Sequence, residues 1–252
     1  MWNFAAFCDE FYVNSRLYLK LELSPDRDTL LHFFEQVRKC YPKMTQFYRR
    51  DDEQGSLILE EMDEEGVRRR YLRLDPTAIK FGCSNPQDVE SVAKYGMTVL
   101  SQAPPQLSLS ELDYDYMDVV FGFDLEYRGN HDQLVAETLF PGVKVLGAIN
   151  ADESLVIDCQ PFFGFRLTAD CQKQMYVEVK NRTSTYEICS GEFEANVMSV
   201  HLTVRRYWDA GVARSLVEAQ RDLLTTGERF AGELIVPYIV QPLQAAISNQ
   251  HE

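Results

Sequence analysis

Glu178 and Lys180 are the residues whose types and spacing come closest to a catalytic pattern. They stand two apart in Tyr176-Val-Glu-Val-Lys180, so a strand would place both side chains on one face. Asp158 lies upstream, on what we expect to be an earlier strand. Two such carboxylates can hold Mg²⁺, and a lysine beside them can stabilise an attacking hydroxide. This set would cut a phosphodiester bond.

Metal-dependent nucleases of the PD-(D/E)xK type use this arrangement, but two features of the chain weigh against it. The residues after Lys180 are typical of a hairpin, whereas such nucleases continue into a helix. The net charge of −14 also disfavours nucleic-acid binding, which needs a basic face. We therefore favour an ion pair on a solvent-facing strand, and we keep the nuclease as an alternative with Asp158, Glu178 and Lys180 as its catalytic residues.

A second candidate is the polar face of several strands in which polar and apolar residues alternate. If these strands share one sheet, their polar side chains gather on one face, which can hold a charged ligand or a protein partner. The predicted ligand or partner face consists of Arg16, Lys20, Arg69, Arg73, Asp118, Asp124 and Glu126.

Two arginine clusters have a structural interpretation. Arg68–Arg70 follows an acidic run, which predicts ion pairs across a hairpin. Arg205 and Arg206 precede Tyr207 and Trp208, and we expect this segment to end a strand, with its aromatic side chains under the C-terminal helices.

Composition indicates a soluble protein without a structural metal. The six cysteines form no Cys-x-x-Cys pair, and the four histidines are too far apart in sequence to indicate a zinc site. The N-terminus does not resemble a signal peptide, and no run of about 18 apolar residues predicts a membrane span. We expect no cofactor, no metal, no membrane association, and a cytoplasmic location with unpaired thiols.

The elements that must position these residues begin with a strand-then-helix unit that occurs twice. Leu21 in the first copy aligns with Leu125 in the second, an offset of 104. The first copy predicts a strand over Arg16–Leu23 and a helix that begins at Ser24 and Pro25. Four strands and a helix follow in the first half, and residues 103–110 are typical of a linker.

The second half repeats this order with additions. A strand over Tyr116–Tyr127 precedes a short helix that starts at Asn130. Two C-terminal helical stretches are expected, the first ended by Gly227 and the second kinked by Pro237. The strands expected in between cover about 143–149, 154–159, 162–168, 174–182, 186–190 and 194–207.

The order strand, helix, four strands, helix, occurring twice, resembles the TATA-binding-protein-like fold and is similar to helix-grip ligand binders. That resemblance implies two antiparallel-sheet halves, residues 1–110 and 111–252, backed by helices. It implies no site, because the likeness lies in element order. The second half departs from the resemblance by about two extra strands and a longer helical tail.

The chain also resembles a sporadically distributed bacterial family of uncharacterised proteins of about 250 residues. Three segments carry the likeness: the opening strand and helix that end in Tyr41-Pro42, the stretch from Arg70 to Phe81, and the region Gly227-Glu-Arg-Phe230. This family has no established activity, so the likeness implies architecture alone.

The sequence thus predicts a duplicated α+β protein that acts without catalysis, binding an unknown protein partner through a sheet face or the cleft between its halves. A small-ligand binder of helix-grip type, with an apolar ligand between the sheet and the C-terminal helix, is the first alternative. The nuclease is the second alternative. We expect a monomer or a homodimer.

Overall fold

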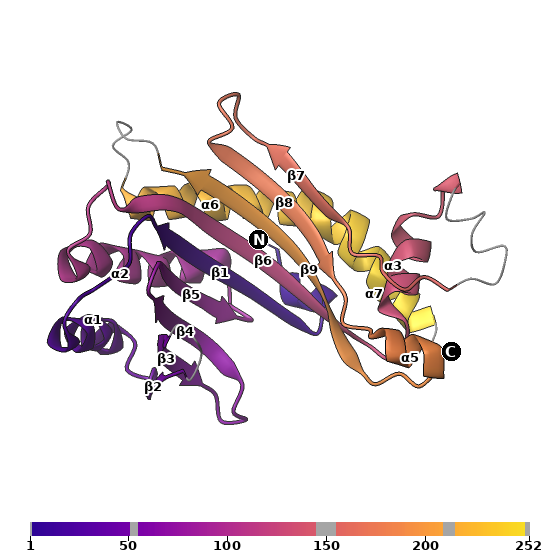
Figure 1. Cartoon of the computed structure of the whole chain (residues 1–252), viewed down its shortest axis with the longest axis horizontal. Coiled ribbons are helices and arrows are strands. Elements are labelled where there is room, and N and C mark those ends of the chain that lie inside the picture. Colours follow the sequence, from indigo (N-terminus) through magenta and orange to yellow (C-terminus); the bar gives the residue numbers. More distant parts are fainter. Residues whose placement is uncertain (1, 51–54, 145–154, 209–214, 250–252) are drawn as a thin grey trace.

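A single antiparallel sheet of nine strands organises the described chain, in the order β2-β3-β4-β5-β1-β6-β9-β8-β7 (Figure 1). The computed structural model describes residues 2–50, 55–144, 155–208 and 215–249. Six α-helices accompany the sheet in these residues, so the fold is α+β with an antiparallel sheet, as predicted.

The described elements follow this order along the chain. The first half comprises η1 (Phe4–Phe7), β1 (Glu10–Leu19), α1 (Arg27–Cys40), β2 (Gln46–Arg49), β3 (Leu57–Met62), β4 (Arg68–Asp75), β5 (Ala78–Ser84) and α2 (Val89–Leu107). The second comprises β6 (Tyr114–Tyr127), α3 (His131–Leu139), β7 (Phe162–Arg166), β8 (Lys173–Lys180), α5 (Thr185–Ser190), β9 (Asn196–Tyr207), α6 (Leu216–Phe230), η2 (Ala231–Val240) and α7 (Gln241–Asn249).

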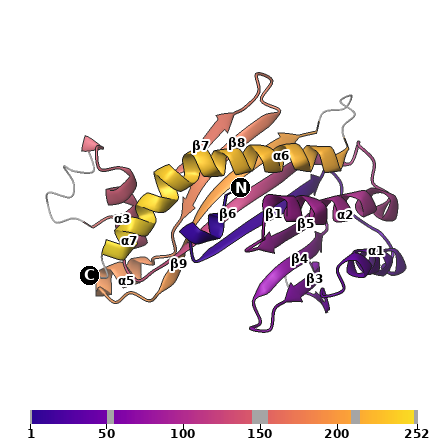
Figure 2. The same ribbon diagram turned by 180° about the vertical axis from the view of Figure 1, so that it is seen from behind.

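The long helices lie on one face of the sheet, which we call the helix face. Figure 2 shows α1, α2 and α6 across this face, and Figure 1 shows the central strands from the opposite side with no described helix in front of them. We call this uncovered side the open face. An antiparallel sheet can leave one face toward water when its strands alternate apolar and polar residues.

Alternation along β1 decides which side chains reach each face. Phe11, Val13 and Leu17 are buried on the helix face, whereas Tyr12 and Arg16 are half-buried on the open face. The neighbouring β6 and β9 add further apolar side chains to the same core. Its largest fully buried members include Phe33, Phe81, Tyr95, Phe121, Phe123 and Met117.

The two halves of the chain meet where β1 pairs with β6, so they form one continuous sheet. Each half places its first strand at this junction. In the first half β5 lies next to β1, and in the second half β9 lies next to β6. The opening strand of each half therefore supplies the centre of the open face.

The first strand and its helix are displaced from the predicted positions. β1 ends at Leu19, so the predicted continuation to Leu23 is wrong, and Leu21 is largely exposed. α1 is capped by Asp26, whose carboxylate accepts from the backbone N–H groups of residues 28 and 29 at 2.9 and 3.0 Å. A carboxylate satisfies the first helical N–H groups well, which explains why the helix starts two residues late.

The segment Thr185–Ser190 is a helix, so the strand predicted over 186–190 is wrong. Ser184 and Glu187 form a reciprocal capping box, and Gly191 ends the helix in the left-handed region. Residues 155–159 form no strand, which also corrects the strand predicted over 154–159. The strand predicted over 143–149 lies mostly outside the described residues.

Helix α2 runs through the segment that was predicted to be a linker. Pro104 and Pro105 lie inside its last turns, and Ser108 closes it in the left-handed region. Ala103 and Leu107 are buried there. Burial of these two side chains offsets the backbone hydrogen bonds that the prolines remove.

The C-terminal helical stretch is continuous, which corrects the predicted stop at Gly227. An added Cβ at Gly227 would overlap the Phe121 ring, so this glycine serves close packing against β6. The segment η2 is π-helical, with the N–H of Gln241 donating to the carbonyl of Val236, and this wider turn accommodates Pro237. By length and composition alone Leu216–Asn249 could cross a membrane, but its buried side chains pack on the sheet.

Candidate binding face

Asp118 is the central charged group of the open face. It is on β6, fully buried, and it faces Arg16 on β1 and Arg205 on β9 in the strand register. Arg205 donates to both carboxylate oxygens, from Nε at 2.7 Å and from Nη2 at 3.0 Å, and Arg16 donates from Nη2 at 3.1 Å. Two guanidinium groups thus share one buried carboxylate. Burial acts to lower the pKa of Arg205, but the hydrogen bonds to Asp118 outweigh it and raise that pKa.

Asp75 repeats this arrangement at the end of β4. Its carboxylate is 2.5 Å from Nε of Arg73 and 2.6 Å from Nζ of Lys80, and its side chain is almost completely buried. Burial acts to raise the pKa of Asp75, but hydrogen bonds from Lys80, Ser56 and Arg73 hold it below its ordinary value. Two cations again share one buried carboxylate.

The two charge clusters lie in one transverse row of the sheet. Arg73 pairs with Lys80, Lys80 with Arg16, Arg16 with Asp118, and Asp118 with Arg205 in the registers of neighbouring strands. We call Arg73, Lys80, Arg16 and Arg205 the cation row. Each of its side chains keeps 19–31% of its surface exposed, whereas both carboxylates are buried. The row and its two carboxylates have a formal charge of +2, four cations against two acids.

Tyrosine rings border the cation row. Tyr18 and Tyr116 stack with their ring centroids 4.4 Å apart, and the Arg205 guanidinium lies 4.1 Å from the Tyr116 ring centroid. Lys80 Nζ is 5.8 Å from the Tyr18 ring. These contacts hold long cationic side chains in place, so a ligand would meet a partly ordered surface.

Three polar side chains, Tyr12, His201 and Glu178, lie in a line across the open face beside this row. The Tyr12 hydroxyl is 2.7 Å from Nε2 of His201, and Nδ1 of His201 is 3.7 Å from a carboxylate oxygen of Glu178. Burial raises the pKa of Tyr12 and lowers the pKa of His201, so both groups are held neutral near pH 7. Gly122 makes room for the Tyr12 ring, which an added Cβ would overlap.

A hollow of about 250 Å³ opens at the β2–β5 end of the open face. Its lining combines four basic side chains with one acid, two tyrosines and an isoleucine: Arg50, Arg68, Arg73, Lys80, Glu60, Tyr48, Tyr71 and Ile58. Glu60 accepts from the Tyr48 hydroxyl at 2.9 Å and pairs with Arg68 at 3.4 Å. The hollow extends the cation row toward the edge of the sheet.

Four of the seven residues predicted for the ligand face lie centrally on the open face. Arg16, Arg73 and Asp118 belong to the cation row and its carboxylates, and Asp124 lies 3.5 Å from the Tyr12 hydroxyl, where burial raises its pKa.

The other three lie away from that centre. Lys20 follows the end of β1, Glu126 is exposed near the end of β6, and Arg69 pairs with Asp63 in the β3–β4 hairpin at 2.7 Å.

The residues of the nuclease alternative lie in different parts of the structure: Glu178 and Lys180 are on β8, and Asp158 is outside the strands. Glu178 pairs with Lys180 at 3.4 Å on β8, which is the ion pair favoured by the sequence. Asp158 is exposed in the irregular segment before β7, where it accepts a hydrogen bond from Nε2 of Gln160 at 3.4 Å. Among the described residues, no group of three or more histidine, cysteine or acidic side chains is placed to hold a metal ion.

The arginine clusters follow their structural interpretations in part. Arg68 pairs with Glu60, Arg69 with Asp63 and Arg70 with Glu61, which confirms the ion pairs predicted across the hairpin.

At the end of β9 the prediction is half right. Trp208 packs edge-on against Tyr114, whereas Tyr207 and Arg205 reach the open face.

Sequence reasoning missed Lys80, Asp75, His201 and the role of Arg205. A usable signal existed for His201 and Arg205, because they alternate with apolar residues along β9. A comparison of the sequence with protein-family models gives no match, and a comparison with curated proteins gives none that is significant.

Proposed function

We propose that this chain is a non-catalytic binding protein that takes an acidic segment of a protein partner on its open face. The cation row carries this proposal. In a chain with a net charge of −14, four cations at the centre of an uncovered sheet form a local site of opposite charge. Charge complementarity of this kind selects a partner and speeds association more than it adds affinity.

A short carboxylate-bearing segment fits this face better than a nucleic acid. The cation row crosses five strands from β4 to β9, which is about 19 Å at the usual strand spacing. Acidic side chains border it, with Glu60 toward one edge of the sheet and Glu178 toward the other. A long polyanion would pass over these acids, whereas a segment with a few carboxylates would contact the cations alone.

Further features support the remaining expectations. All six cysteines are free thiols, which agrees with a reducing compartment, and we propose a cytoplasmic location.

We also propose that the two halves arose by duplication in a TATA-binding-protein-like order, within the bacterial family that the sequence resembles. Support comes from the helix caps Asp26 and Asn130, which keep the offset of 104, and from the matching positions of β1 and β6.

The helix-grip alternative gains little support from the packing of α6. Gly227 brings this helix against the Phe121 ring, and Leu223 and Leu224 are buried beside it, so side chains fill that interface. Nothing in the described contacts favours the nuclease set.

A pair of threonine substitutions tests the proposed face. Thr203, half-buried on the open face of β9, becomes glutamate in one variant, and Thr225, exposed on α6, becomes glutamate in the control. Each variant is used to capture proteins from a host extract, with quantitative mass spectrometry. We expect partners of the wild type to persist with Thr225→Glu and to be lost with Thr203→Glu. Equal recovery by all three proteins would contradict the proposal.

A further inference from the structure

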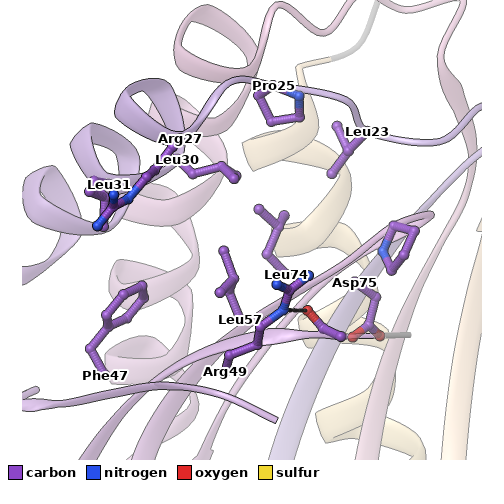
Figure 3. Close-up of a pocket in the computed structure, with 12 residues that line it drawn as sticks. Leu23, Pro25, Arg27, Leu30, Leu31, Phe47, Arg49, Leu57, Leu74 and Asp75 are labelled. Carbon is purple, nitrogen blue, oxygen red and sulfur yellow. Dashed lines mark hydrogen bonds between the residues drawn. The ribbon is translucent and has the colours of Figure 1, made fainter. Parts of the chain in front are cut away.

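An apolar hollow of about 520 Å³ lies on the helix face, between α1 and the ends of β2, β3 and β4 (Figure 3). Leu30 from α1 and Leu57 and Leu74 from the strands point into it, and Leu31 and Phe47 stand at its open side. The last two side chains are 38% and 41% exposed. The hollow is therefore reachable from solvent.

The fold leaves this space unfilled because α1 packs mainly against α2 and meets the edge strand β2 through the ring contact of Phe34 with Phe47. Protein interiors usually fill such gaps, since apolar side chains that face empty space or water lose dispersion contacts. The volume falls in the range of about 300–1,000 Å³ that is common for small-molecule sites. A ligand with an apolar body would restore the missing contacts.

Two arginines give the rim of the hollow a positive charge. Arg27 is in the first turn of α1, and it makes no hydrogen bond or ion pair within the described part of the chain. A cation is disfavoured at that end of a helix, so helix stability does not explain it. Arg49 on β2 donates from Nε to the carbonyl of Gly55 at 3.2 Å, which is an uncharged acceptor. The nearby Asp75 is compensated by its two cations.

We propose that this hollow binds a single-tailed amphipathic anion, with its apolar tail among the leucines and its charged head at Arg27 and Arg49. The leucine walls offer no hydrogen-bonding partners to a polar tail, and the arginines favour a negative head over a neutral one. The hollow lies on the opposite side of the sheet from the cation row, so its ligand and the proposed partner would bind at separate places. Asp75 is common to both, because it lines the hollow and pairs with Arg73 and Lys80.

Titration calorimetry with straight-chain carboxylates of increasing length tests the tail. Below their micelle concentrations and at physiological salt, we expect saturable one-to-one binding, with the Kd falling about four-fold for each methylene buried. The gain ends when the tail fills the hollow. A matched series of primary alcohols should bind at least five-fold more weakly. Absence of saturable binding in both series, or a Kd independent of chain length, would overturn the proposal.

Substitutions on α1 and β2 test the head and the location. Arg27→Gln with Arg49→Gln should weaken carboxylate binding toward that of the alcohol and leave alcohol binding unchanged. Arg38→Gln, exposed in the last turn of α1, should change neither. Leu31→Trp narrows the hollow at an exposed position and should shift the best chain length downward. If carboxylates bind the Arg27→Gln/Arg49→Gln variant as tightly as the wild type, and Leu31→Trp leaves the best chain length unchanged, while circular dichroism shows intact folds, the assigned site is wrong.

Discussion

Replacing Asp118 with asparagine removes the charge that holds Arg16 and Arg205 across the centre of the sheet. Removing one partner of a fully buried ion pair costs about 3–5 kcal/mol, and an exposed pair contributes about 0–1 kcal/mol. Asp118 is fully buried, but the two arginine side chains keep 31% and 23% of their surface exposed. We therefore expect a loss near the lower limit of the buried range, about 3 kcal/mol in the free energy of unfolding.

Urea unfolding at pH 7.5 measures this loss, and the slope with urea should stay unchanged because the exposed surface does not change. Glu126→Gln, on the same strand but exposed, is the matched control and should stay within about 0.5 kcal/mol of the wild type. A double-mutant cycle with Arg205→Gln should give a coupling energy above about 1 kcal/mol. If Asp118→Asn and Glu126→Gln show equally small losses in the free energy of unfolding, Asp118 does not organise the cation row.

Three further predictions concern packing and protonation. Gly122→Ala should cost about 1–3 kcal/mol by urea unfolding because its methyl group overlaps the Tyr12 ring, whereas Gly142→Ala, which meets no atom within 4 Å, should cost much less. Burial lowers the pKa of His201, so between that pKa and about 6.5 the unfolded state binds more protons and the stability from this group rises with pH. An NMR titration of the His201 ring should accordingly give a pKa below 6.5, and a value above it would be contrary to this. Burial also raises the pKa of Cys83, so iodoacetamide at pH 8 should modify this thiol at least ten-fold more slowly in the native chain than in urea; equal rates would show an accessible thiolate.

The alternation of polar and apolar residues along the strands made it possible to predict that polar side chains gather on one face of the sheet. Arg16 and Asp118 stand at polar positions of alternating strands, and this local pattern predicts that both side chains lie on the polar face of the sheet. The starts of α1 and α3, which are 104 residues apart, could also be predicted approximately, because Asp26 and Asn130 are both good capping residues.

Which side chains pair across neighbouring strands was not predictable from the local pattern of polar and apolar residues. Arg205 reaches Asp118 because β9 pairs with β6, and 87 residues separate the two in sequence. A shift of one residue in that register would have turned Arg205 away from the open face. Lys80 was missed for the same reason, since its contact with Asp75 depends on the tight turn between β4 and β5.

Local contacts that compete with the residue pattern explain why two secondary-structure elements were predicted wrongly. The capping box of Ser184 and Glu187 makes α5 helical, although the residue pattern of this stretch predicts a strand. At Pro104, tertiary burial of the neighbouring Ala103 keeps α2 helical where proline alone predicts a break. In both cases a contact of a few residues outweighs the propensity of the segment.

Photo-crosslinking in the native host tests the partner face most directly. An azidophenylalanine replaces Tyr18, beside the cation row, in one strain and Tyr238, which is 70% exposed on the helix side, in the other. Both changes keep an aromatic ring of similar size. We predict that irradiation joins the chain to a distinct protein partner at Tyr18 and not at Tyr238, and that the crosslinked peptide is rich in aspartate and glutamate. Crosslinks at Tyr238 alone, or a basic peptide at Tyr18, would contradict an open face built for an acidic partner.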